Sequence, residues 1–288
     1  MSQSSVSTAA STPRRRRVKW SADLLLGTVL LGSIVLAVLF AGVLFPAGTD
    51  VMDLGARLTP PHFGFPHPLG TDPIGRDVLS RVVYGGRVSL TVGLVSVALS
   101  VVIGSVLGLL AGYYQGRLGA LIMRLADIQL AFPFILLAIT VIAIIGPGLW
   151  KLIAVMVVSQ WAQYARLVRS QALALRERDY VQAAFALGAG NNRVMFRHIV
   201  PNAIGPIVVL STLNVANNIL LESGLTFLGL GVDPQVPSWG GMLADGRTYL
   251  QSAWWVSVFP GVAITLTVLG FNLLGDWLRD RLDPQGRS

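Results

Sequence analysis

The sequence has no cysteine among its 288 residues and few charged residues of either sign. The absence of cysteine excludes a disulfide framework, thiol catalysis and a thiolate metal site. Charged residues make up 12% of the chain, against about 25% in soluble globular domains, and hydrophobic residues make up 53%. These proportions exclude an ordinary soluble domain and favour a membrane protein.

The chain also lacks the short motifs of several enzyme classes. It contains no G-x-x-x-x-G-K-[ST] phosphate loop, no H-E-x-x-H zinc motif and no G-x-S-x-G nucleophile motif. The pair His62 and His67 stands among proline and aromatic turn residues, with no carboxylate at ligand spacing. We therefore expect no catalytic residue and no metal site in this chain.

What the sequence does have is long uncharged apolar runs. Five of them reach the roughly 18–20 residues that an α-helix needs to cross a bilayer. A sixth run, 152–165, is shorter and spans only if Arg166 and Arg169 extend their charged ends to the membrane surface. We expect an all-α polytopic membrane protein with six transmembrane helices, whose five longer spans are 24–45, 88–114, 128–150 (with a kink at Pro133), 201–221 and 248–275.

Basic residues are distributed unevenly about these six spans. With the N-terminus inside, 16 of the 22 lysines and arginines fall on the cytoplasmic side, as the positive-inside rule requires. We therefore expect a protein of the inner or plasma membrane with both termini in the cytoplasm. In a soluble chain the net charge of +8 would suggest a nucleic-acid partner, but the distribution of the basic residues favours a lipid bilayer as the surroundings and not a nucleic acid.

Composition divides the chain into four segments. Residues 1–20 are Ser/Thr-rich and then basic, and we interpret them as a disordered cytoplasmic tail. Residues 21–87 hold a first transmembrane helix, without the cleavage site of a signal peptide, and an extracytoplasmic segment rich in proline and glycine. Residues 88–276 form a core of five transmembrane helices, and residues 277–288 a second cytoplasmic tail.

Two local ion pairs are expected on the outer side. Asp72 and Arg76 stand four residues apart, near Asp77 at the start of a helix. In the last outer loop Asp245 and Arg247 stand two residues apart and could pair with each other.

Two spans carry small or polar residues at helical spacing. In the second span Gly104, Gly108 and Gly112 belong to a row of small residues at every fourth position, which lets another helix pack closely. In the fifth span four polar residues fall within an arc of about 80°: Ser211, Asn214, Asn218 and Glu222. Such residues turn toward the bundle interior or toward water. The stripe either lines a solute path or forms hydrogen bonds between helices.

A basic segment between the fourth and fifth spans has the pattern of a helical hairpin. It begins with Asp179 as an N-cap and Gln182 three residues later, which is a capping-box pattern. Gly188 can end this helix in a left-handed conformation, and Pro201 suits the first turn of the next span. Four apolar residues among the arginines favour a docking surface over a simple connector: Val181, Phe185, Met195 and Phe196.

This hairpin, residues 179–200, resembles the EAA loop of ABC importer permeases, EAA-x3-G-x9-I-x-L-P. Three residues depart from the motif, because Gln182 replaces the usual Glu, His198 the Ile and Val200 the Leu. From about residue 60 to residue 284 the chain also resembles the C-type permease subunits of dipeptide, oligopeptide and nickel importers, in strings such as HPLGTDPIGRDVLSRVVYGGRVSL, FLGLGVDPQVPSWG and FNLLGDWLRDRLDP. The residues at the remaining motif positions are identical, namely Ala183, Ala184, Gly188 and Pro201, and with Gln182 at the Glu position they make up the residues aligned with the EAA loop.

The resemblance implies a type I ABC importer permease architecture and a machine of several chains. The partners would be a second related permease subunit, two ATPase subunits or domains that use ATP and magnesium, and an extracytoplasmic solute-binding protein. This chain would form half of the translocation path. Its hairpin would be the coupling helix that sits on the ATPase. The implied solute is a di- or oligopeptide, with nickel or another small solute as the alternative.

Two other classes of protein fit the sequence less well. A stand-alone carrier would use Glu222 and the asparagines of the stripe, but such carriers have more ionisable residues within the membrane and internal repeats. An intramembrane enzyme would need paired carboxylates or a serine–histidine arrangement within the spans, and the sequence has neither.

Overall fold

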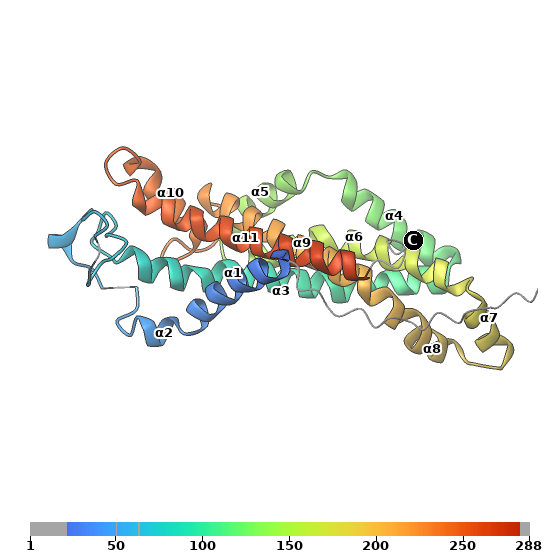
Figure 1. Ribbon diagram of the computed structural model, residues 1–288. Coiled ribbons are helices and arrows are strands. Elements are labelled where there is room, and N and C mark those ends of the chain that lie inside the picture. The colour runs from blue at the N-terminus through green and yellow to red at the C-terminus, as the bar shows by residue number, and fades with distance from the viewer. Residues whose placement is uncertain (1–21, 50, 63, 283–288) are drawn as a thin grey trace, which may run out of the picture.

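The chain folds into an elongated bundle of helices (Figure 1). The computed structural model describes residues 22–49, 51–62 and 64–282. Within these ranges the only β-type pairing is an isolated bridge between Thr71 and Asp77. The expected tail 1–20 and the end of the expected tail 277–288 lie outside the described residues. The long helices are α1 (Ala22–Leu39), α3 (Val78–Tyr113), α6 (Leu149–Arg176), α9 (Val200–Phe227) and α11 (Trp255–Leu282).

Shorter helices connect or cap the long ones. Helix α2 extends α1 after a turn, α4 and α5 follow α3, and α10 precedes α11. Between α6 and α9 the chain forms α7, α8 and one π-helical turn. Their bounds are α2 (Ala41–Leu44), η1 (Leu54–Ala56), α4 (Gly116–Ala131), α5 (Phe134–Ile145), α7 (Asp179–Ala186), α8 (Asn191–Val194), the π-turn η2 (Met195–Ile199), α10 (Trp239–Gly246) and η3 (Arg247–Tyr249).

The all-α, polytopic class that the sequence predicted is confirmed. Four described helices are long and apolar enough to cross a membrane: α1, α3, α9 with the short helices before it, and α11. The bent pair α4 and α5 gives a fifth crossing if it acts as one span. A count of six therefore also needs α6, the 28-residue helix that contains the short run 152–165.

The third predicted span, 128–150, is wrong as a single helix. Helices α4 and α5 meet at an angle of 87°. The break follows from Pro133, which has no N–H for the helix ladder and forces the residue before it out of the helical region. Phe132 is accordingly extended, with φ −84° and ψ 128°. The expected kink is thus a full break.

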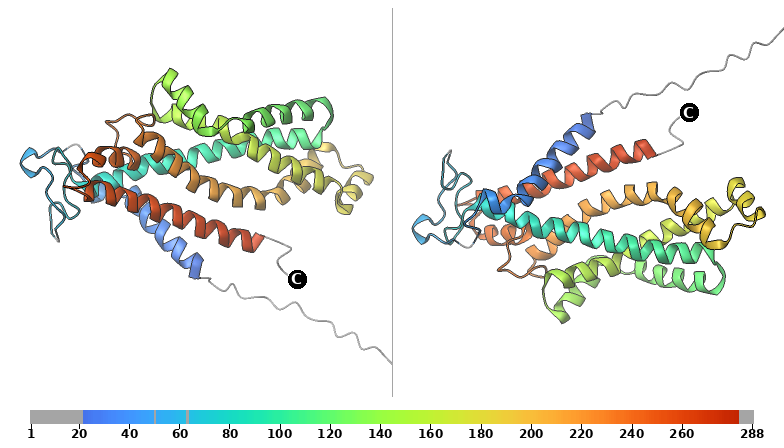
Figure 2. Two further views of the ribbon diagram at one scale, coloured as in Figure 1. Left: turned by 90° about the horizontal axis from the view of Figure 1, so that it is seen from above. Right: turned by 90° about the horizontal axis from the view of Figure 1, so that it is seen from below.

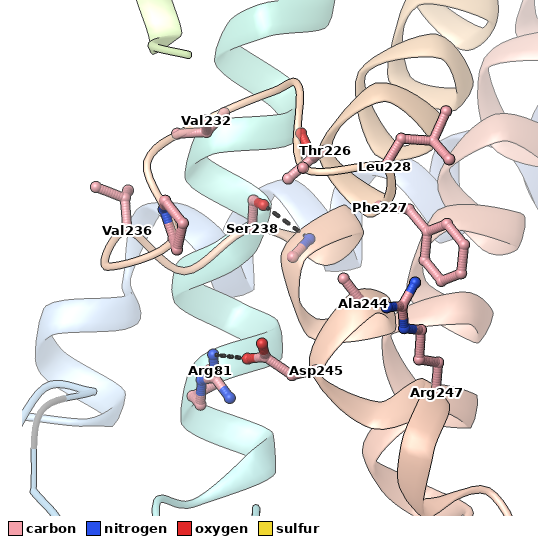
Figure 3. Close-up of a pocket in the computed structure, with 13 residues that line it drawn as sticks. Arg81, Thr226, Phe227, Leu228, Val232, Val236, Ser238, Ala244, Asp245 and Arg247 are labelled. Carbon is pink, nitrogen blue, oxygen red and sulfur yellow. Dashed lines mark hydrogen bonds and ion pairs between the residues drawn. The ribbon is translucent and has the colours of Figure 1, made fainter. Parts of the chain in front are cut away.

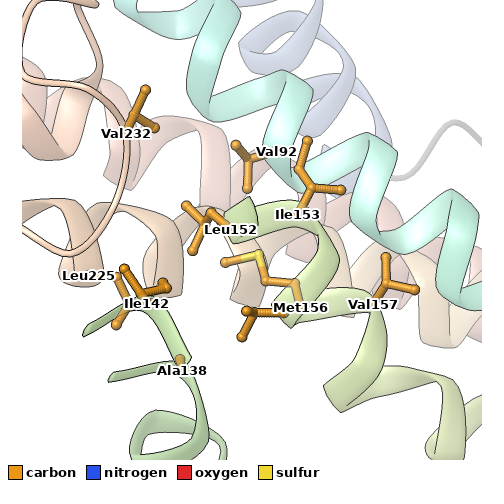
Figure 4. Packing of buried hydrophobic residues seen from close by; sticks show 10 residues of the cluster. Val92, Ala138, Ile142, Leu152, Ile153, Met156, Val157, Leu225 and Val232 are labelled. Atoms are coloured by element: carbon orange, nitrogen blue, oxygen red, sulfur yellow. The ribbon is translucent and has the colours of Figure 1, made fainter. Parts of the chain in front are cut away.

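Two separate apolar clusters hold the halves of this bent pair. Helix α4 packs through Ile122, Met123 and Ala126 against Ala162 and Ala165 of α6. Helix α5 packs further along α6, where Ala138 and Ile142 meet Leu152 and Met156, with Leu225 and Val232 beside them (Figure 4). The middle of α6 lies between the two clusters. The chain bends away from it there.

Helices α3 and α6 approach closely through the row of small residues. A β-carbon on Gly104 would lie 2.6 Å from the β-carbon of Tyr164. One on Gly108 would lie 2.8 Å from the α-carbon of Ala165. A third, on Gly112, would lie 2.8 Å from the β-carbon of Ala172. The backbones therefore meet along three helical turns, at distances that only glycine allows.

A network of ion pairs lies just before and within the first turns of α3. Asp72, which is fully buried, accepts hydrogen bonds from Arg76 Nε (2.6 Å) and Arg81 Nη1 (2.7 Å). The predicted Asp72–Arg76 pair is thus confirmed, although Arg81 joins it. The predicted pair of Asp245 with Arg247 is wrong, because Asp245 Oδ2 accepts from Arg81 Nη2 at 3.1 Å (Figure 3). Arg81 reaches across from α3 to α10 and so competes successfully for this carboxylate.

The two ends of the bundle differ in what they carry. The hairpin of α7 and α8 lies at one end, and α11 runs toward this end (Figure 2). The described parts of the segment between α2 and α3 (46–49, 51–62 and 64–77) and α10 lie at the other end. This second end also has a cavity of about 310 Å³ between α9, α10 and the loop that joins them (Figure 3). The hairpin and α10 therefore lie at opposite ends of the bundle.

Candidate functional site: a projecting hairpin and a buried polar stripe

The hairpin begins differently from the predicted capping box. Arg178 is the N-cap, with the extended φ −74° and ψ 139°, and no side chain caps the helix. Asp179 is already the first helical residue, where its negative carboxylate interacts favourably with the positive end of the helix dipole. The amide of Gln182 turns back and donates to the carbonyl of Arg176 at 2.9 Å. The capping box is therefore wrong by one residue in register.

The end of α7 is a Schellman motif centred on Gly188, as the sequence predicted. Gly188 has φ +82°. Its N–H donates to the carbonyl of Phe185 at 2.9 Å, and the N–H of Ala189 donates to the carbonyl of Ala184 at 3.0 Å. This pair of bonds satisfies carbonyls that the helix end leaves free. It turns the chain sharply toward α8.

The apolar residues of the hairpin divide into an inner and an outer set. Val181 is fully buried and Met195 nearly so, which corrects the prediction that both are docking residues. They pack with Val194 and Ile199 onto the ends of α3 and α6. This packing fixes the hairpin to the bundle, because its anchor residues come from α7, α8 and the π-turn.

The outer set is what the hairpin presents to its surroundings. Leu187 is 89% exposed and Phe196 is 64% exposed, while Phe185 is half-buried. Helical periodicity did not identify Leu187, because this residue stands at the helix end and outside the helical repeat. Its place directly before the helix-ending Gly188 is the signal that could have identified it. Exposed Arg193 and Arg197 accompany these apolar side chains.

The residues that match the EAA loop lie at the surface of the hairpin. Gln182 and Ala183 are exposed, and Ala184 is half-buried. Because Ala183 and Ala184 have small side chains, another protein can approach the backbone of α7 closely there. Gly188 is exposed, and a β-carbon added to it would have no atom within 4 Å, while Pro201 is in the first turn of α9. The hairpin therefore presents to a protein partner a helix face of small side chains, with the exposed Leu187 beside it.

The polar stripe of α9 faces the bundle. Asn214 Nδ2 donates to the hydroxyl of Tyr164 on α6 at 2.9 Å. Asn218, which is fully buried, donates to Ser96 Oγ on α3 at 2.7 Å and to Gln160 Oε1 on α6 at 3.1 Å. Gln160 Nε2 donates back to Asn218 Oδ1. One carboxamide thus joins three long helices.

Glu222 stands at the outer end of the same stripe. Its side chain is fully buried and lies beside α3. Ser89 Oγ donates to its Oε2 at 2.8 Å and Thr226 Oγ1 to its Oε1 at 2.9 Å. Ser223 Oγ adds a third, longer bond of 3.3 Å. Hydroxyl groups from α3 and α9 therefore satisfy this carboxylate.

In the single chain, Asn214, Asn218 and Glu222 each form hydrogen bonds to a neighbouring helix. The remaining stripe residue, Ser211, is half-buried and donates within its own helix to the carbonyl of Ile207. A solute-path lining by these four residues stays a prediction. Among the described residues no group of three or more His, Asp or Glu could hold a metal ion.

Comparison with known proteins identifies the family. Residues 104–288 match the family described as binding-protein-dependent transport system inner membrane component. The chain belongs to this family. It is accordingly a multi-pass membrane protein and a non-catalytic permease subunit of an ABC importer, as the resemblance of its hairpin implied. The match includes the glycine row, the hairpin and the polar stripe, and it begins within α3.

Individual members of the family are closely similar to this permease. It is 48% identical over 222 residues to a dipeptide transport system permease protein of Alkalihalophilus pseudofirmus, which covers 77% of this chain and 73% of the relative. It is 49% identical over 217 residues to a di/tripeptide transport system permease protein of Pseudomonas aeruginosa, covering 75% and 72%.

A solved structure supports the fold alone. The inward-facing MetNI methionine ABC transporter aligns with a TM-score of 0.53 and 21% identity, over 70% of this chain and 96% of the other. Both proteins therefore share the helical architecture of an importer permease.

Proposed function

We propose that this permease subunit imports di- and oligopeptides, as half of a translocation path that a second related permease completes. Two ATPase subunits or domains, using ATP and magnesium, would drive the cycle, and an extracytoplasmic binding protein would deliver the peptide. The hairpin carries the coupling part of this proposal, because it is anchored by buried Val181 and exposes Leu187 and Phe196 at one end of the bundle. The peptide solute is carried by the similarity to the dipeptide and di/tripeptide permeases.

The exposed hairpin surface supports ATPase coupling in physical terms. The anchor residues tie the hairpin to the ends of α3 and α6, so a pull on it is transmitted to the two helices that the glycine row holds together. Moving a two-state permease from 1:99 to 99:1 needs ~5.5 kcal/mol of differential affinity. Nucleotide-driven closure of an ATPase would supply this through Asp179, Gln182, Ala183, Ala184, Gly188 and Pro201 and their neighbours.

Gln182 in place of the family's Glu bears on this coupling. Its side chain donates to the carbonyl of Arg176 within this chain. A carboxylate could not donate this bond, because an ionised Glu only accepts hydrogen bonds. We infer that docking here depends on shape and apolar contact more than on a charge at this residue.

The orientation and the four segments complete the proposal. Both termini and the hairpin would be cytoplasmic, with residues 46–77 and α10 outside. The positive-inside distribution supports this choice. So does the placement of the hairpin and of α10 at opposite ends of the bundle. The permease core would be residues 88–276, preceded by the first helix with its outer segment and followed by the tail 277–288.

Uptake by the complete reconstituted complex tests this function. The complex of both permeases and the ATPases is reconstituted in liposomes, with the binding protein outside. Complexes whose ATPases face the lumen should import a labelled di- or tripeptide only when ATP is enclosed in the lumen. The double variant Leu187→Asp/Phe196→Asp should reach the membrane but lose ATPase association and uptake. Leu228→Asp, a 61% exposed leucine at the opposite end, should keep both. Uptake of a nickel chelate in place of peptide would overturn the substrate assignment.

A further inference from the structure

An open cavity lies under the break between α4 and α5. It has a volume of about 320 Å³, within the range of small-ligand sites. Its walls come from the break itself at Pro133 and Phe134, and from the middle of α6 and α9. Because the two apolar clusters fix α4 and α5 on either side, the cavity opens onto the middle of α6, where Gln163 is exposed.

The floor of this cavity is polar but uncharged. Ser159, Gln160 and Gln163 come from α6, and Asn217 comes from α9. None of the described residues that line it is charged. Polar side chains exposed within membrane-spanning helices are uncommon and mark substrate pathways or contacts with other helices. The polar side chains exposed on the cavity floor therefore indicate a binding site or a contact with another helix.

Two of these carboxamides have no partner in the part of the chain that the structure describes. Gln163 and Asn217 are exposed and form no hydrogen bond there. Gln160 differs, because it is buried and bonds to Asn218. Neighbouring Asn217 and Asn218 thus divide their roles, since Asn218 joins the helices and Asn217 faces the cavity.

We propose that this cavity binds the backbone amide groups of the transported peptide through Gln163 and Asn217. The inference rests on the proposed function. A carboxamide offers a carbonyl acceptor and N–H donors, which complement the N–H and C=O of a peptide group. Every peptide carries the same backbone groups, so such a site is indifferent to side chains. Two exposed carboxamides also bind weakly enough for release, which passage requires.

The uncharged lining separates this occupant from the other solute classes. A free nickel ion would need carboxylate or imidazole ligands, and the described residues of the cavity wall include none. The apolar rim of Pro133, Phe134, Ile135 and Leu221 would instead contact the peptide's side chains without selecting among them.

The test counts peptides imported per ATP hydrolysed by the complete complex in liposomes. The double variant Gln163→Leu/Asn217→Leu should lower this ratio roughly tenfold, as expected for two lost hydrogen bonds. The factor should be the same for a series of tripeptides with different side chains. ATPase stimulation by the loaded binding protein should stay unchanged. The control Thr265→Val removes an exposed hydroxyl that bonds only within α11, and it should leave the ratio unchanged.

Each contrary result has a separate meaning. An unchanged ratio in the double variant overturns the site. A factor that varies with the peptide's side chains overturns backbone recognition, and loss of the second permease from the purified variant shows that the face is a subunit contact instead. A wild-type complex that imports no peptide overturns the proposed function, and this inference with it.

Discussion

Replacing Asn218 by leucine removes the hydrogen bonds that join α3, α6 and α9. The leucine side chain has the same number and branching of heavy atoms and is slightly larger, so the change removes polarity without leaving a cavity. Three bonds are lost, namely one to Ser96 and two exchanged with Gln160. Interhelical bonds in membranes average about 0.6 kcal/mol each, so their direct loss comes to roughly 2 kcal/mol.

The groups left behind add to this loss. Gln160 is 5% exposed, and its side chain exchanges two hydrogen bonds with Asn218. A buried polar group without a partner costs about 1–3 kcal/mol. Since part of this penalty is already counted in the lost bonds, we expect Asn218→Leu to destabilise the folded chain by about 2–4 kcal/mol.

Thermal unfolding of the detergent-solubilised protein measures this effect. Asn218→Leu should lower the apparent midpoint by several degrees. The control is Asn217→Leu, one residue away on the same helix, whose side chain is exposed and bonds to nothing in the described chain. It should stay within about 0.5 kcal/mol of the wild type. Equal unfolding midpoints for the two variants would refute the claim that Asn218 stabilises the bundle by joining helices while Asn217 does not.

Two further substitutions test the packing of α3 on α6 and the buried ion pairs at the start of α3. Gly108→Val forces a β-carbon into the backbone of α6 and should destabilise by about 1–3 kcal/mol; Gly32→Val, at an open site, should lower the melting midpoint far less. Arg81→Ala removes a partner of buried Asp72 and should cost roughly 1.5–3 kcal/mol in chemical denaturation. Arg57→Ala, at an exposed arginine, serves as its control, and equal losses would contradict the proposed weight of the buried network.

Helical periodicity predicted the features that depend on one helix at a time. The spacing of Gly104, Gly108 and Gly112 predicts one face, and the structure has α6 against that face. The arc of the polar stripe likewise predicts that Asn214, Asn218 and Glu222 share a side. Local backbone rules also succeeded at Gly188, where a left-handed residue is needed.

Features that depend on contacts between several segments could not be predicted by these local rules. Asp245 pairs with Arg81, 164 residues away in the sequence, and no local pattern predicts that choice. Val181 is buried because α3 and α6 end beside it, which the amphipathic pattern of the hairpin alone does not reveal. Pro133 predicted a kink, but the full break depends on two clusters that hold α4 and α5 apart.

Site-specific cross-linking tests the coupling role of the hairpin most directly. The chain has no cysteine, so Leu187→Cys introduces the only thiol of this subunit. In the assembled importer, a short thiol-to-amine reagent should join this residue to an ATPase subunit, while Leu228→Cys, exposed at the opposite end, should give no such adduct. An intact complex in which Leu187→Cys forms no adduct with the ATPase, or in which Leu228→Cys forms one equally well, would contradict the coupling role of the hairpin.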